Sequence, residues 1–220
     1  MTTKTIRKDK LAELFERLKA SGAVIVAPVR NREKVFFGQV TRFDEVVLDF
    51  IQTAFSAKST VFPRCEELFT YEKDGNSFKV NDPKFSDKEI IVFGLRPCDA
   101  ATFGYMKDFF LKENPDVHFE NRISRLTLVA LSCKTHDEYC FCTSVGSSPA
   151  DERHADILLT EIDNGDFYAE VVTPKGEAVV TKAPGAFADS PAVDKSKHVT
   201  QVPEVFNLEA LQAKLREGAY

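Results

Sequence analysis

Residues 89–99 read Glu-Ile-Ile-Val-Phe-Gly-Leu-Arg-Pro-Cys-Asp, and residues 125–133 read Arg-Leu-Thr-Leu-Val-Ala-Leu-Ser-Cys. Each stretch contains a nearly continuous apolar run, which is typical of a strand that is buried on both faces of a sheet. The segment between them predicts a helix from about residue 99 to residue 111, with Asp99 as its capping residue. Strand, helix and strand in this order predict a βαβ unit with two parallel strands.

The segments on either side of this unit predict one more long helix and several hairpins. Leu11, Leu14, Phe15 and Leu18 have the spacing of one helix face, so we expect a helix over residues 8–20. The remaining expected elements are hairpins 24–29 with 34–40, 68–72 with 77–80 and 156–162 with 167–173, an irregular loop at 182–197, and a short helix at 208–215. The fold class is therefore α/β, with a mixed sheet that contains the βαβ unit and additional antiparallel hairpins.

The length of 220 residues favours a single domain. We divide it into an N-terminal helix and hairpins (1–88), the βαβ part (89–150), and a C-terminal hairpin, loop and short helix (151–220). A hydrophobic content of 43% and a charged content of 29% are ordinary for a globular chain.

Composition and charge exclude several classes of protein. The net charge is −5 and no basic block is present, so nucleic acid is not an expected partner. The longest apolar stretch, residues 22–29, contains Pro28 and is far shorter than the roughly 20 residues of a membrane span. Residues 1–8 lack the apolar segment of a secretory signal, so we expect a cytoplasmic location.

The five cysteines are the most informative residues of the chain. They are Cys65, Cys98, Cys133, Cys140 and Cys142, and the last three fall within ten residues. An odd number of cysteines in a reducing compartment argues against a disulfide framework. Clustered cysteines in such a chain indicate a metal site or a redox site.

Four of these cysteines are expected at one edge of the sheet. Cys98 follows the first buried strand and Cys133 follows the second, and the carboxyl ends of parallel strands meet at one edge, where ligand sites form. Cys140 and Cys142 lie in the loop directly after Cys133, so four thiols can converge. Four is the number that an iron–sulfur cube or a tetrahedral zinc ion requires.

The spacing favours the iron–sulfur cluster. The pattern Cys-x6-Cys-x-Cys contains neither the paired Cys-x2-4-Cys knuckles of structural zinc nor the tandem Cys-x2-Cys of ferredoxins. Cys98 is expected just before a helix, where free amides and the helix dipole favour a thiolate. Ser144, Gly146 and nearby amides could donate hydrogen bonds to the cluster.

The other candidate residues have simpler interpretations. Cys65 is best interpreted as a small buried hydrophobe, and His136 as a polar loop residue or a hydrogen-bond donor behind the ligands. Arg96 could balance the charge of a cluster, pair with Asp99 or contact a neighbouring subunit. The remaining expectations are that His118, His154 and His198 lie on the surface and that Phe103, Phe109 and Phe110 lie in the core.

Motifs for other chemistries are missing from the sequence. It has no glycine-rich phosphate loop, no Gly-x-Gly-x-x-Gly, no nucleophile elbow and no His-Glu-x-x-His. The chain therefore carries no evident nicotinamide or flavin site of its own.

Two of its motifs together carry a family resemblance. Phe93-Gly94-Leu95-Arg96-Pro97-Cys98-Asp99, then Cys133, then Cys140-Phe141-Cys142-Thr143-Ser144-Val145-Gly146 before Pro149, resemble the iron–sulfur subunit family of anaerobic sulfite reductase. The beta subunit of cytoplasmic sulfhydrogenases belongs to the same family. Segments 61–63 and 66–69 are similar as well.

The resemblance implies an iron–sulfur subunit that works beside a flavoprotein and passes electrons to or from a catalytic partner. Cys98, Cys133, Cys140 and Cys142 match the cysteines of the family, whereas Cys65 does not. Longer members continue into a ferredoxin-like module with two further clusters, but this sequence has no Cys-x2-Cys. We therefore expect another subunit to carry those clusters, or a direct transfer to a partner.

The resulting hypothesis is an electron-transfer subunit of a cytoplasmic, anaerobic oxidoreductase complex. One [4Fe-4S] cluster would be held by Cys98, Cys133, Cys140 and Cys142, and no catalytic acid or base is needed. The expected partners are a flavoprotein that binds FAD and NAD(P), and a ferredoxin-like or catalytic hydrogenase or reductase subunit. Two alternatives stay open: a zinc-stabilised assembly scaffold, and a protein in which Cys140 and Cys142 cycle through a strained disulfide.

Overall fold

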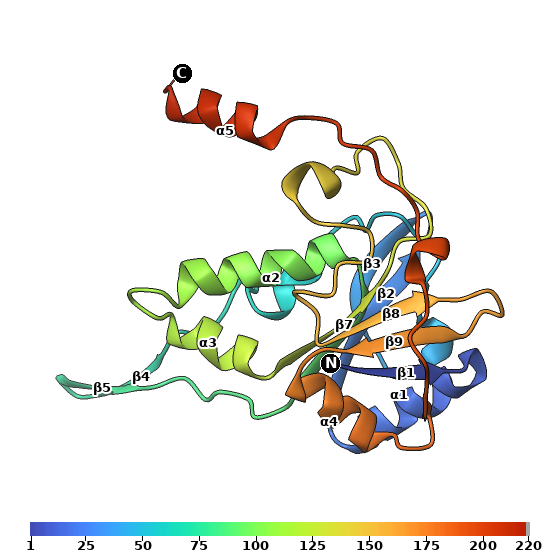
Figure 1. Ribbon diagram of the computed structural model, residues 1–220. Helices are drawn as coiled ribbons and strands as arrows, with labels where there is room; N and C mark the ends of the chain where they lie inside the picture. The colour runs from blue at the N-terminus through green and yellow to red at the C-terminus, as the bar shows by residue number, and fades with distance from the viewer. Residues whose placement is uncertain (219–220) are drawn as a thin grey trace.

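An eight-stranded mixed sheet runs through the computed structural model, which describes residues 1–218 (Figure 1). The strands follow the order β10-β1-β9-β8-β7-β6-β2-β3 across the sheet. Their bounds are β1 (Thr2–Ile6), β2 (Val24–Asn31), β3 (Lys34–Val40), β6 (Ile90–Leu95), β7 (Leu126–Leu131), β8 (Ile157–Glu161), β9 (Phe167–Val171) and β10 (Phe187–Asp189). Neighbours among β2, β6, β7 and β8 are parallel, and the outer pairs are antiparallel. The predicted α/β fold with a mixed sheet is confirmed.

The predicted βαβ unit is β6, α2 (Pro97–Phe110), α3 (Val117–Ser124) and β7. The two strands pair in parallel, with Ile90 opposite Leu126 and Val92 opposite Leu128. Alternate side chains of β6 and β7 enter two different hydrophobic cores, one on each face of the sheet. This double burial explains why both strands read as continuous apolar runs.

Helices cover both faces of the sheet (Figure 1). On one face, α1 (Leu11–Ala20) and α4 (Pro174–Lys182) share a core with Phe93 and Val129. On the other face, α2 and α3 share a core with Val92 and Leu128. No helix within residues 1–218 has the length and apolar character that crossing a membrane requires.

The three predicted hairpins are present as β2–β3, β8–β9 and a separate pair, β4 (Thr70–Asp74) with β5 (Ser77–Asn81). Gly75 has a φ of 58° in the tight turn of the separate pair, as expected for Asp-Gly-Asn. The β4–β5 hairpin extends away from the main body in Figure 1. The C-terminal helix α5 (Leu208–Arg216) is also present and lies at the top of the view in Figure 1.

Four of the α-helices and strands within residues 1–218 were not predicted. They are β1, β10, α3 and α4. β10 falls in the segment 182–197, so the prediction of an irregular loop there is wrong at this strand. Because β1 lies between β9 and β10, the first and last parts of the chain enter the same sheet. The division of the chain into one domain of three parts stays a prediction.

The start of α2 differs from the sequence prediction. Arg96 is the residue before the helix, Pro97 is its first residue, and Asp99 lies inside the first turn. The prediction that Asp99 caps the helix is therefore wrong, because Pro97 is preorganised for the first helical position and starts the helix earlier. The carboxylate of Asp99 instead accepts a hydrogen bond from Ser56 Oγ at 3.2 Å.

The three phenylalanines of α2 have different environments. Phe103 is 1% exposed and Phe110 packs against the same core, as predicted. Phe109 is 80% exposed, so its prediction as a core residue is wrong. Phe109 points away from the sheet because α2 is covered on one side only. The centroids of the Phe109 and Phe110 rings are 5.0 Å apart, and the rings meet edge to face.

Candidate functional site

A bulge at the end of β6 directs the chain toward the cysteines. Gly94 has a φ of 77°, which favours glycine, and the pairing register between β6 and β7 shifts at this point. A Cβ atom at Gly94 would lie 3.2 Å from Leu48 Cδ2. Phe93 and Leu95 consequently enter opposite cores, although residues two apart in a regular strand share a face. The next residues, 96–98, then leave the sheet edge.

Cys98 and Cys133 lie at this same edge of the sheet. Cys98 is in the first turn of α2, directly after β6, and Cys133 is two residues beyond the end of β7. The backbone of Cys133 is held on both sides: its N–H donates to Pro149 O at 2.9 Å and its carbonyl accepts from Thr200 N at 2.8 Å. Two cysteines that are far apart in sequence are thus brought to one end of the parallel strands.

Cys140 and Cys142 lie in the loop that follows Cys133. The thiol of Cys140 is 3.4 Å from Asp137 Oδ1, and Cys142 starts a short 3₁₀ turn, Thr143–Val145. Gly146 ends this turn with a φ of 75°. The carbonyl of Cys142 accepts from Val145 N and Ser147 N, at 3.2 Å and 2.9 Å. The loop is therefore a defined structure that returns toward Cys133.

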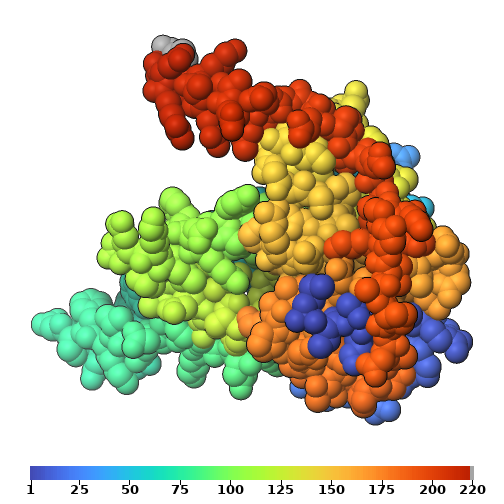
Figure 2. All heavy atoms as spheres, viewed as in Figure 1, coloured from blue at the N-terminus to red at the C-terminus, as the bar shows by residue number. Residues whose placement is uncertain are grey.

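The C-terminal arm, residues 199–206, lies along this cysteine loop, as Figure 2 shows. Thr143 Oγ1 donates to Pro203 O at 3.1 Å, and the rings of Phe141 and Phe206 are 6.1 Å apart. Ser144 Oγ accepts from Val205 N at 2.8 Å. The hydroxyl of Ser144, which was expected to face a cluster, therefore holds the arm instead.

The four thiols are close enough to influence one another's ionisation. Cys133 and Cys142 raise the pKa of Cys98, Cys142 and Cys140 raise the pKa of Cys133, and Cys140 raises the pKa of Cys142. Like charges produce such shifts only when they lie near one another in a medium that screens poorly. The four cysteines that the sequence singled out therefore form one group.

Burial is the main reason why all four thiols resist ionisation. It raises the pKa of Cys98 to about 12 and that of Cys133 to about 11, and it also raises the pKa values of Cys140 and Cys142. The expectation that the start of the helix makes Cys98 a thiolate is wrong, because the pKa of Cys98 is raised and not lowered. A backbone N–H of Asp99 lowers the pKa of Cys98, but burial outweighs it. Thiolates at this site thus need a positive partner to form at neutral pH.

The donor set of Cys98, Cys133, Cys140 and Cys142 consists of sulfur atoms alone. Within residues 1–218, no three Cys, His, Asp or Glu side chains are arranged so that they could hold a metal ion. A cube places each thiolate on a different iron atom, so its ligands surround a larger volume than the ligands of one ion. Soft sulfur donors are the ligands that such clusters use.

Arg96 lies two residues before Cys98 in the sequence and is a buried cation. Its guanidinium donates to Ser132 O at 3.0 Å, to Leu48 O at 3.4 Å and to Phe50 O. It also lies over the ring of Phe50, 4.2 Å from the centroid. Its positive charge opposes the rise in the pKa values of Cys133 and Cys140. The ion pair with Asp99 that the sequence allowed is not among the contacts of the described residues.

The remaining candidate residues lie outside the thiol group. Cys65 is exposed, so its interpretation as a buried hydrophobe is wrong. Its neighbours in the segment 61–69 are mostly surface residues. His136 Nδ1 lies 2.7 Å from Thr200 Oγ1, which ties the cysteine loop to the C-terminal arm and agrees with a polar loop role.

Two of the three histidines expected at the surface are partly buried. His118 Nδ1 lies 3.8 Å from Glu66 Oε2, and His198 Nδ1 lies 3.4 Å from Asp163 Oδ1. The expectation that they are surface residues is wrong, because each lies beside a carboxylate in a cavity wall. His154 is exposed, as expected.

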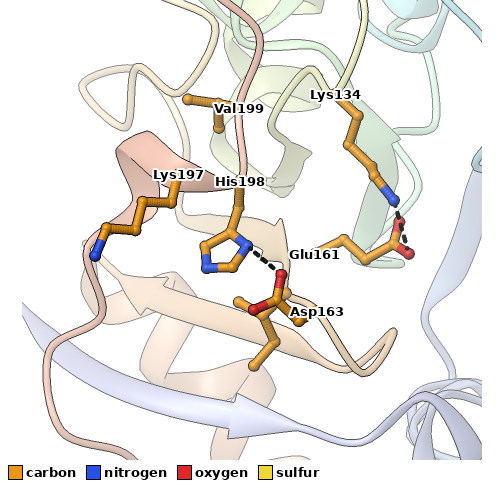
Figure 3. A pocket seen from close by; sticks show the side chains of 7 residues that line it. Lys134, Glu161, Asp163, Lys197, His198 and Val199 are labelled. Atoms are coloured by element: carbon orange, nitrogen blue, oxygen red, sulfur yellow. Dashed lines mark ion pairs between the residues drawn. The ribbon is translucent and has the colours of Figure 1, made fainter.

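A cavity of about 380 Å³ opens beside the cysteine loop (Figure 3). Lys134, which follows Cys133, forms an ion pair with Glu161 at 3.1 Å, and His198 faces Asp163. The charges of Lys134 and Glu161 in its wall are thus paired with one another. This cavity has less to offer a ligand than the thiol group, and we assign it no role.

Asp151 lies on the C-terminal side of the cysteine loop, to which it is joined by a hydrogen bond from Ser147. It is buried and accepts hydrogen bonds from Arg153 Nε at 2.8 Å, from the Arg153 N–H at 3.1 Å and from Ser147 Oγ at 2.8 Å. The hydrogen bonds from Arg153 hold the pKa of Asp151 well below its usual range. A carboxyl with a lowered pKa stabilises the fold above its unfolded pKa of about 3.9, and this stability is lost as the pH falls toward its folded pKa.

We therefore expect Asp151→Asn to lower the free energy of unfolding by about 2 kcal/mol at pH 7, as for hydrogen bonds to a charged group. The difference from the wild type should begin to shrink as the pH falls below about 4, because Asp151 then takes up a proton in the unfolded wild-type chain while it stays ionised in the folded one. Urea unfolding at pH 7 and at pH 3.5 measures both values. A difference that stays constant with pH would mean that the charge of Asp151 contributes nothing.

Comparison with known proteins identifies a distant relative. The chain is 30% identical over 184 residues to "Sulfhydrogenase 2 subunit beta" of Pyrococcus furiosus, and no protein-family model matches it. The alignment covers 84% of this chain and 52% of that subunit. The chain thus spans about half the length of the curated relative it matches. The predicted resemblance to sulfhydrogenase beta subunits is confirmed at the level of a distant homologue.

Proposed function

We propose that this distant homologue of a sulfhydrogenase beta subunit is an electron-transfer subunit of an oxidoreductase complex. One [4Fe-4S] cluster is held by Cys98, Cys133, Cys140 and Cys142, and the complex is cytoplasmic and anaerobic. The partners are a flavoprotein subunit that binds FAD and NAD(P), and a ferredoxin-like or catalytic subunit of the hydrogenase or sulfur reductase type. The chain itself contributes a relay and no catalytic acid or base.

One observation carries this proposal: Cys98 and Cys133 follow two parallel strands at their carboxyl edge, and Cys140 and Cys142 lie in the loop directly after Cys133. Ligand sites in open α/β sheets form at this edge. The homology supports membership of an oxidoreductase complex, since the relative is named as a sulfhydrogenase subunit.

The protein's own residues would do three things at the site. Cys98 and Cys133 extend from the ends of β6 and β7 and supply ligands from a rigid sheet edge. The loop with Cys140 and Cys142 closes over them and is held by Asp151, Thr200 and the C-terminal arm. The bound cluster supplies one-electron chemistry. Cys98 is exposed, and Cys133, Cys140 and Cys142 are partly buried, so the site would lie at the surface of this chain.

The two alternatives have less support. A zinc scaffold would use the same four cysteines, but the sequence lacks the paired Cys-x2-4-Cys knuckles that are typical of structural zinc. A disulfide-cycling protein needs a thiolate with a lowered pKa, but the pKa values of Cys140 and Cys142 are raised. We therefore keep the cluster as the proposed function.

The first experiment is the metal content of anaerobically purified protein. We expect about four irons and four acid-labile sulfides per chain, with a rhombic EPR signal after dithionite reduction. Zinc in place of iron would favour the scaffold. Metal-free protein in which Cys140 and Cys142 form a reversible disulfide would favour thiol chemistry, and either result would overturn the proposal.

A further inference from the structure

Arg96 is a buried cation whose partners are neutral. Only 7% of its surface is exposed, and its hydrogen bonds go to the backbone carbonyls of Leu48, Phe50 and Ser132. No ion pair within residues 1–218 includes it. A buried charge that has no opposite partner costs several kcal/mol in effective terms, so such residues normally face an anion.

The hydrogen-bonding capacity of Arg96 is also incomplete. Its Nε is buried and has no partner among the described residues, and the Oγ of the neighbouring Ser132 is buried without one as well. Both residues adjoin the thiol group, because Ser132 precedes Cys133 and Arg96 lies two residues before Cys98. Native proteins rarely leave buried donors unused, and a bound ion or group is a usual explanation.

The surroundings of Arg96 fix it in place. The segment 48–50 supplies two of its carbonyl partners, and the ring of Phe50 lies 4.2 Å from the guanidinium. Ser132 O at 3.0 Å joins it to the end of β7. Among the ionisable groups that act on Arg96, the thiols of Cys133 and Cys98 come first and Asp49 and Asp99 follow. The guanidinium is thus fixed at the end of β7, next to the residue that precedes Cys133.

We propose that Arg96 is the counter-charge of the cluster and sets its reduction potential. This role rests on the proposed function. Reduction adds one electron to the cluster and breaks no bond, so the reduced state carries one more negative charge. A fixed cation stabilises that state more than the oxidised one, and in a buried site the effect is weakly screened. Hydrogen bonds toward the sulfur atoms act in the same direction.

The test is an anaerobic redox titration of the cluster, monitored by EPR, with dithionite as the source of electrons. Arg96→Met removes the charge, Arg96→Lys retains it, and Arg96→Gln removes it but can still donate to the carbonyls. Lys58→Met is the matched control, because Lys58 is an exposed cation whose charge acts on Asp99 beside Cys98. Iron is measured in every variant.

We expect the neutral variants to lower the ratio of reduced to oxidised cluster about tenfold at the wild-type midpoint, which is about 59 mV for one electron. Arg96→Lys should retain most of the wild-type midpoint, and Lys58→Met should match the wild type because water screens its charge. If Arg96→Met loses iron, Arg96→Gln provides the same comparison.

A neutral variant with full iron and the wild-type midpoint would overturn the role of Arg96 while leaving the cluster proposal intact. An equal shift in Lys58→Met would also overturn it, because any nearby charge would then act alike. Wild-type protein without iron would instead overturn the proposed function itself.

Discussion

Replacing Cys133 with serine is expected to abolish the iron–sulfur absorbance and to reduce iron from about four atoms per chain to well below one. The thiol of Cys133 raises the pKa of Cys98, and the thiols of Cys140 and Cys142 raise the pKa of Cys133. A serine hydroxyl is a hard and weakly acidic donor, so it holds iron poorly beside three thiolates.

The substitution should leave the fold nearly unchanged. The structural contacts of Cys133 are made by its backbone, with Pro149 O and Thr200 N, and serine retains both. Far-UV circular dichroism should therefore match the wild type. Iron loss with retained secondary structure assigns the effect to the missing ligand.

Cys65→Ser is the matched control for this variant. Cys65 is exposed and does not appear among the groups that act on the four thiols. We expect it to retain all its iron and its EPR signal. Full iron in Cys133→Ser, or iron loss in Cys65→Ser, would require a different set of ligands.

The edge of the sheet could be predicted because its signal is local. The apolar runs of β6 and β7 are continuous since both faces of each strand are buried, and Cys98 and Cys133 directly follow them. Parallel pairing then determines where the strand ends lie. No knowledge of distant contacts is needed for this step.

The two segments that pack against the site, residues 48–50 and 199–206, could not be predicted in this way. Segment 48–50 holds Arg96 through backbone carbonyls, which every residue type carries, so no sequence pattern marks it. The arm at 199–206 reaches the cysteine loop through Ser144 and Thr143, but these contacts span about 60 residues of sequence. Such contacts depend on the completed fold.

The sequences of α4 and β1 explain why these two elements were not predicted. α4 contains Pro174 and Gly176, which are uncommon inside helices, yet Pro174 is favoured in the first turn and Thr173 caps the helix. Gly176 is required there because a Cβ atom would lie 2.3 Å from Asp156 O. β1 was missed because Thr2–Ile6 is mostly polar, and only Ile6 is buried.

Replacing Phe103 with alanine is expected to lower the free energy of unfolding by about 3–5 kcal/mol, the usual cost of truncating a buried aromatic side chain. Phe103 is 1% exposed and belongs to the core between α2, α3 and the sheet. Alanine leaves a cavity under α2 that a close-packed interior fills only in part. Urea unfolding under anaerobic conditions measures the loss.

Phe109→Ala is the matched control, since it removes the same atoms from the same helix. Phe109 is 80% exposed, so the expected change is within about 0.5 kcal/mol. Comparable losses in the two variants would mean that α2 does not face the sheet as described. Because Cys98 lies in the first turn of α2, a loosened helix should also release iron faster. We therefore expect Phe103→Ala, and not Phe109→Ala, to lose its cluster at a lower temperature than the wild type.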